Sequence, residues 1–166
     1  MPPLYYACVT IHILAALVWL GGMFFLGLVG APALRMLEPA ELRQRLFDEL
    51  GRRFRTVGWI CIAILVVTGL GNLYFRGLLH WNAVLGSAAF WHTGIGHALA
   101  GKLAVVVAMV LISAIHDFID GPAAGRLVAD SPAALVLRRR AALMARLNAV
   151  FGVLLVIAAV RLARGG

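Results

Sequence analysis

Charged side chains are scarce in this chain of 166 residues. They make up 13% of the sequence, and the seven acidic residues are outnumbered by 15 lysines and arginines. The hydrophobic fraction is 63%, well above the roughly one half that is typical of soluble domains. This composition excludes an ordinary soluble domain and indicates a single integral membrane domain over residues 1–166.

Several familiar motifs are also missing. The two cysteines, Cys8 and Cys61, lack CxxC spacing, so neither a disulfide framework nor a thiolate metal site is indicated. There is no CxxCH motif for covalent haem attachment, no dinucleotide-binding glycine pattern and no phosphate-binding loop. The net charge of +8 comes from arginines that flank apolar segments, so it predicts no nucleic-acid partner.

Four apolar segments are long enough to cross a hydrocarbon core of about 30 Å, which takes roughly 20 helical residues. They cover residues 4–30, 57–76, 98–118 and 141–163. Between the first two, leucines recur every four residues among charged residues, which predicts an amphipathic helix at the interface that runs into the second span. The sequence therefore predicts an all-α, integral membrane four-helix bundle.

The arginines predict the orientation of this bundle. Most of them lie in the two loops on the side opposite the chain termini. Loops rich in lysine and arginine stay in the cytoplasm. We therefore expect a multi-pass protein of a bacterial-type plasma (inner) membrane, with both termini facing outward.

The first span carries a stripe of polar and soft side chains. Cys8, His12, Trp19 and Met23 are separated by four, seven and four residues, which places them on one face of a helix. His12 lies deepest among the histidines of the outer half, and an ionisable group inside a membrane is a functional candidate by default. Three glycines of the same span are expected to allow close helix approach, namely Gly21, Gly22 and Gly27.

Neutral imidazole is a good ligand for haem iron and for copper. Helical bundles hold haem between facing helices, with histidine as the axial ligand. A second ligand must lie at the depth of His12, and His97 is the first choice, followed by Lys102 and His92. We thus predict a metal site formed by His12 and His97. His116 is expected to lie about 20 Å deeper and to be excluded from this site.

Two further residues are expected beside the cofactor, Trp19 on the first span and Asn72 near the outer end of the second. Haem b in this position would make the protein a small membrane cytochrome. It would pass electrons between quinone and a redox partner on the outer side. Copper is the alternative cofactor, with soft ligands available at Cys8, His12, Met23 and Met109. A non-catalytic membrane assembly subunit, whose polar face serves helix packing, is a further alternative.

The segments HILAALVWLGGMFF, GRRFRTVGWICIAILVVTGLGNLYFRG and GKLAVVVAMVLISAIHDF resemble the CopD-like membrane proteins, a family named for copper resistance. This resemblance covers most of the chain and implies copper handling at the membrane. The chain is also more weakly similar to HemJ-type protoporphyrinogen oxidases, in which a first-span histidine and a later lysine are linked to b-type haem. His12 and Lys102 match those two positions.

Overall fold

A computed structural model describes residues 2–80, 84–127 and 131–163 of the chain. Within these ranges every regular element is a helix. The elements are α1 (Pro3–Phe25), the π-helical turn η1 (Leu26–Gly30), α2 (Ala31–Arg35), α3 (Ala40–Phe75), α4 (Ala88–Trp91), α5 (Gly94–Ile115), the π-helical turn η3 (His116–Asp120), α6 (Gly121–Gly125) and α7 (Pro132–Ala163).

Four helical stretches are long and apolar enough to cross a membrane, which confirms the predicted four-helix membrane fold. They are Pro3–Arg35, Ala40–Phe75, Gly94–Ala123 and Pro132–Val160. The predicted amphipathic helix forms the first half of α3 and continues into the second span without a break. At 1.5 Å per residue α3 is about 54 Å long, so it exceeds the hydrocarbon core by several turns.

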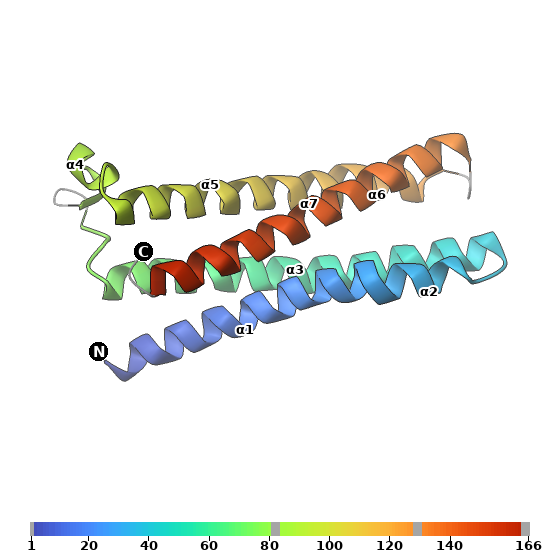
Figure 1. The fold of residues 1–166 in the computed structure, drawn as a ribbon. Helices are drawn as coiled ribbons and strands as arrows, with labels where there is room; N and C mark the ends of the chain where they lie inside the picture. The colour runs from blue at the N-terminus through green and yellow to red at the C-terminus, as the bar shows by residue number, and fades with distance from the viewer. Residues whose placement is uncertain (1, 81–83, 128–130, 164–166) are drawn as a thin grey trace.

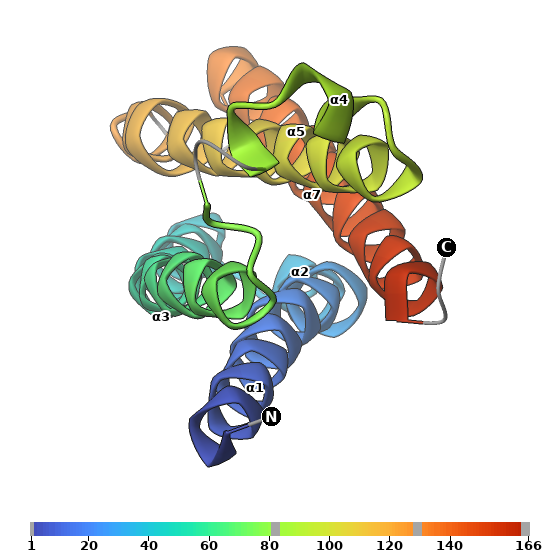
Figure 2. The ribbon, with the colours of Figure 1, turned by 90° about the vertical axis from the view of Figure 1, so that its left-hand side faces the viewer.

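The bundle consists of two helical hairpins (Figure 1). α1 packs along α3, and α5 packs along α7, while α1 and α7 also touch each other. Seen end-on, α1 and α5 occupy diagonally opposite corners (Figure 2). The two chain ends lie together with α4 at one end of the bundle, here called the terminal end, and α2 and α6 lie at the other, here called the arginine-rich end.

Few side chains are buried inside the bundle. The buried apolar residues among those described are Ala15, Cys61, Ile62, Leu99, Met109 and Ala134. Many large apolar side chains face outward instead, and Leu28 and Val67 are 73% and 69% exposed. An apolar outer surface around helices that satisfy their own backbone hydrogen bonds is what contact with lipid requires.

Local sequence signals shape the loop at the terminal end. α3 ends at Phe75 and is capped by Gly77, whose φ of 71° favours glycine, and Leu78 N–H donates to the Leu73 carbonyl at 2.9 Å. α5 begins after Thr93, whose hydroxyl accepts the N–H of Gly96 at 3.1 Å. These two caps fix the ends of the helices that carry Asn72 and Lys102.

Candidate functional site

The polar stripe of α1 faces α3, and three of its side chains lie against glycines of that helix. Measured from the position that a Cβ would occupy, Cys8 Sγ lies 2.8 Å from Gly71, His12 Cε1 lies 3.6 Å from Gly69, and the Trp19 ring lies 3.6 Å from Gly58. Conversely, a side chain of α3 lies against a glycine of α1, because the ring of Phe54 contacts Gly22. The prediction of close approach is wrong for the other two glycines of the first span, Gly21 in α1 and Gly27 in η1, because nothing lies within 4 Å of a Cβ at either position.

The imidazole of His12 is oriented by a hydroxyl group of α3. His12 Nδ1 lies 2.8 Å from Thr68 Oγ1, which in turn lies 2.6 Å from the Ile64 carbonyl oxygen. The Thr68 hydroxyl has one proton, and a carbonyl oxygen can only accept, so Thr68 donates to Ile64. It therefore accepts from His12 Nδ1–H, which leaves the Nε2 lone pair of His12 available for a ligand.

Cys8, like His12, forms a hydrogen bond with Thr68 of α3. Its thiol donates to the backbone carbonyl oxygen of Thr68 at 3.3 Å. Cys8 and His12 are four residues apart on one helix and so lie one above the other. Thr68 thus forms hydrogen bonds with both a thiol and an imidazole in the terminal half of the α1–α3 hairpin. The pair offers one sulfur and one nitrogen donor.

Lys102 and Asn72 lie in the same half of the bundle. Lys102 lies on the third turn of α5 and Asn72 on the last turn of α3, both towards the terminal end. Asn72 is one turn beyond Thr68 on α3, and its buried Oδ1 accepts no hydrogen bond from any residue that the structure describes. The structure therefore places a buried amide oxygen, unpaired among the described residues, one helical turn from the residue that contacts Cys8 and His12.

The histidines of the terminal loop have other partners. His97 Nδ1 lies 3.0 Å from the Thr93 carbonyl oxygen, and the rings of His92 and His97 are 6.4 Å apart. Across the described ranges, no three His, Cys, Asp or Glu side chains gather as a metal site. The pairing of His12 with His97 thus remains a prediction, and the structure shows His12 with Cys8 and Thr68 instead.

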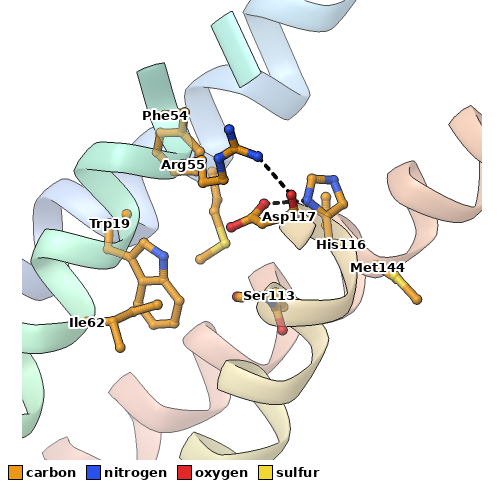
Figure 3. Close-up of a pocket in the computed structure, with 12 residues that line it drawn as sticks. Trp19, Phe54, Arg55, Ile62, Ser113, His116, Asp117 and Met144 are labelled. Carbon is orange, nitrogen blue, oxygen red and sulfur yellow. Dashed lines mark hydrogen bonds and ion pairs between the residues drawn. The ribbon is translucent and has the colours of Figure 1, made fainter. Parts of the chain in front are cut away.

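A second polar cluster, not predicted as a site, lies towards the arginine-rich end (Figure 3). The Asp117 carboxylate accepts from Trp59 Nε1 at 3.0 Å and lies 2.8 Å from His116 Nδ1. Arg55 donates to the Asp117 backbone carbonyl oxygen at 2.9 Å. His116 and Asp117 begin the π-helical turn η3, a type of distortion that is frequent at functional sites.

This cluster borders a pocket of about 60 Å³ between the two hairpins. Trp19 lines it from α1, and Ser113 and Asn148 line it from α5 and α7. Asn148 is only 4% exposed and donates to Ser113 Oγ at 2.8 Å. His116 therefore belongs to this pocket, together with Asn148.

Comparison with known proteins identifies the family. The copper resistance protein D (CopD) family matches residues 48–162, a region that contains Lys102, Asn72 and the His116 cluster but not α1. An uncharacterized protein of Aquifex aeolicus (strain VF5) is 33% identical over 112 residues, which are 67% of this chain and 66% of that protein. No solved structure matches.

These matches support the predicted resemblance to the CopD-like proteins and lend no support to the weaker similarity to HemJ-type oxidases or to haem b. A link to copper is consistent with the family, whose description names copper resistance. The fold agrees with a membrane protein, because four apolar helices are long enough to make the chain a multi-pass membrane protein. The chain belongs to the copper resistance protein D family.

Proposed function

We propose that this protein handles copper in the membrane by binding Cu(I) between Cys8 and His12. The observation that carries the proposal is the shared link to Thr68, which holds the Cys8 thiol and leaves His12 Nε2 free. The CopD family match supports copper as the cargo. The ligand residues lie outside the matched region, so their assignment rests on geometry alone.

The donor set suits the proposed ion. Thiolate sulfur is a soft ligand that favours Cu(I), and imidazole binds copper well. The Thr68 hydroxyl acts as the second-sphere partner that fixes the tautomer and orientation of a ligating histidine. On binding, the ion would displace the thiol proton of Cys8, because the thiolate is the metal ligand.

The proposed site lies in the terminal half of the bundle. With both termini outward in a bacterial-type inner membrane, this half would face the cell exterior. Copper would then reach Cys8 and His12 from outside. The six described acidic residues all lie towards the opposite end, in α3, η3 and the turn before α3, so they do not compete for the cation.

A haem b site has less support in the structure. It would need a second axial ligand facing His12, and His97 instead contacts Thr93 and His92. Haem, and with it an electron-transfer role with quinone or an outer redox partner, therefore stays a prediction from the sequence. Lipid contact does not depend on this choice, since the outer surface of the helices is apolar.

The test is a titration of detergent-purified protein with Cu(I), followed by metal analysis and an absorption spectrum. We expect bound copper in the parent protein and a sharp loss in His12→Ala and in Cys8→Ser. His116→Ala is the matched control, because it removes a histidine from the opposite half and should keep the copper. Equal copper in all four proteins, or a Soret band that disappears in His12→Ala, would overturn the proposal.

A further inference from the structure

A second cavity opens between α5 and α7 in the terminal half of the bundle. Its volume is about 300 Å³, at the lower end of the range for small-molecule pockets. Its walls are apolar apart from one lysine, and small residues leave the space open. The lining residues are Ala98, Gly101, Lys102, Val105, Leu154, Leu155 and Ala158.

Lys102 is the only charged group among these lining residues. Its side chain is half-buried, and no hydrogen bond or ion pair joins it to the rest of the described chain. Arg76, which follows α3 at the same end of the bundle, is also a cation. A cation in apolar surroundings is stabilised when an anion accompanies it.

The protein supplies no acidic side chain for this role in the described terminal half. Glu38, Glu41, Asp48 and Glu49 lie before or early in α3, and Asp117 and Asp120 lie in η3. The remaining one, Asp130, lies outside the described residues. No acidic side chain of the described terminal half therefore serves as its counter-ion, and an anion from another molecule can take this place.

We propose that this cavity binds an anionic amphiphile, with the acidic head on Lys102 and the acyl chain along the apolar wall formed with α7. The lysine provides charge and hydrogen-bond donors, and the apolar lining excludes a free, fully hydrated anion as the preferred ligand. An anionic phospholipid and a fatty acid carry the same chemistry. The proposal is independent of the copper function, because Lys102 is not one of the proposed copper ligands.

The proposal can be tested with the full-length protein in neutral detergent micelles. The melting temperature is recorded during titration with three probes: phosphatidylglycerol, laurate and inorganic phosphate. We expect phosphatidylglycerol, laurate or both to raise the melting temperature, and inorganic phosphate to have no effect. A response to only one of the two amphiphiles identifies the source of the anionic head. Phosphatidylcholine serves as the uncharged lipid control.

Two variants separate the head contact from the chain contact. Lys102→Gln should weaken the affinity for the amphiphile about tenfold, so that a tenfold higher concentration gives the same rise in melting temperature. This is the effect of losing one charge-assisted hydrogen bond. Ala158→Phe should fill the cavity and abolish the stabilisation, whereas Ala159→Phe, which is exposed and does not line the cavity, should behave like the parent.

The melting temperature without ligand reports whether each variant folds. If Lys102→Gln unfolds in neutral micelles, Lys102→Arg keeps the charge and should retain the anion response. An equal response of the parent and Lys102→Gln to phosphatidylglycerol would overturn the proposal. So would a full response to inorganic phosphate, or a response of Ala158→Phe that equals that of Ala159→Phe.

Discussion

At the scale of single residues, the chemistry of His12 depends on one hydroxyl group. Thr68 donates its proton to the Ile64 carbonyl oxygen and accepts from His12 Nδ1. The direction of these hydrogen bonds decides which imidazole nitrogen is free. Without Thr68 the ring would lose both its fixed tautomer and its fixed orientation.

Substitution of Thr68 therefore tests the positioning of His12. Thr68→Val keeps the shape and removes the hydroxyl, so Cu(I) affinity should fall by roughly 10-fold to 100-fold, the usual effect of losing a second-sphere partner. Thr68→Ser keeps the hydroxyl and should bind Cu(I) like the parent. Competition with a Cu(I) chelator measures both affinities, and equal values for the valine and serine variants would show that Thr68 does not position His12.

At the scale of elements, the α1–α3 hairpin depends on contacts between large side chains and glycines. The side chains of Cys8 and His12 fit against α3 because Gly71 and Gly69 have no side chains there. The two glycines differ in the space that is available for an added methyl group. A Cβ at Gly69 would make an ordinary contact with His12 at 3.6 Å, whereas a Cβ at Gly71 would lie only 2.8 Å from Cys8 Sγ.

This difference gives a matched pair of variants on one helix. Gly71→Ala should displace the Cys8 thiol and weaken Cu(I) binding. Gly69→Ala should leave binding unchanged and stabilise α3 by up to about 1 kcal/mol, because alanine favours helix over glycine. Chelator competition and the melting temperature report the two effects. The hairpin account fails if Gly69→Ala weakens copper binding more than Gly71→Ala.

Much of this architecture can be predicted from the sequence, because long apolar runs have few alternatives in a membrane. The four spans and the α1 stripe of Cys8, His12 and Trp19 follow from length and helical periodicity. The residues of α3 that contact this stripe cannot be predicted in the same way. Thr68 and Gly71 have no distinguishing pattern in the sequence, and only the packing of α1 on α3 reveals their role.

The polar pocket near His116 was missed for a similar reason. His116 and Asp117 are adjacent in the sequence, and His116 is predicted only to lie far from the His12 site. A π-helical turn at His116–Asp120 changes the helical register there, and periodicity based on a regular α-helix does not anticipate such a turn. Trp59 and Arg55, from a different hairpin, then complete the cluster.

At the scale of the whole molecule, the two ends of the bundle differ in charge. The described acidic residues and most arginines lie at the arginine-rich end, whereas the proposed copper and amphiphile sites lie in the terminal half. The spans of α1 to α2 and of α3 are about 50 Å long or more, so one end extends beyond a core of about 30 Å. The charge asymmetry predicts that the arginine-rich end is the one that protrudes, on the cytoplasmic side.

Topology reporters test this orientation in bacterial cells. An alkaline phosphatase fused after Gly166 should be active, because the terminal end is expected to face outward, and a fluorescent protein fused there should be dark. Glu41→Cys, in a background without Cys8 and Cys61, should resist a membrane-impermeant thiol reagent until the cells are lysed. Labelling of Glu41→Cys in intact cells would reverse the assigned orientation.

The central claim is that Cys8 and His12 together bind Cu(I), and X-ray absorption spectroscopy of the copper-loaded protein tests it most directly. The account predicts a first shell that contains one sulfur and one imidazole nitrogen. The sulfur contribution should vanish in Cys8→Ser, and the imidazole contribution should vanish in His12→Ala. A first shell without sulfur in the parent protein, or one that neither substitution changes, would contradict the account.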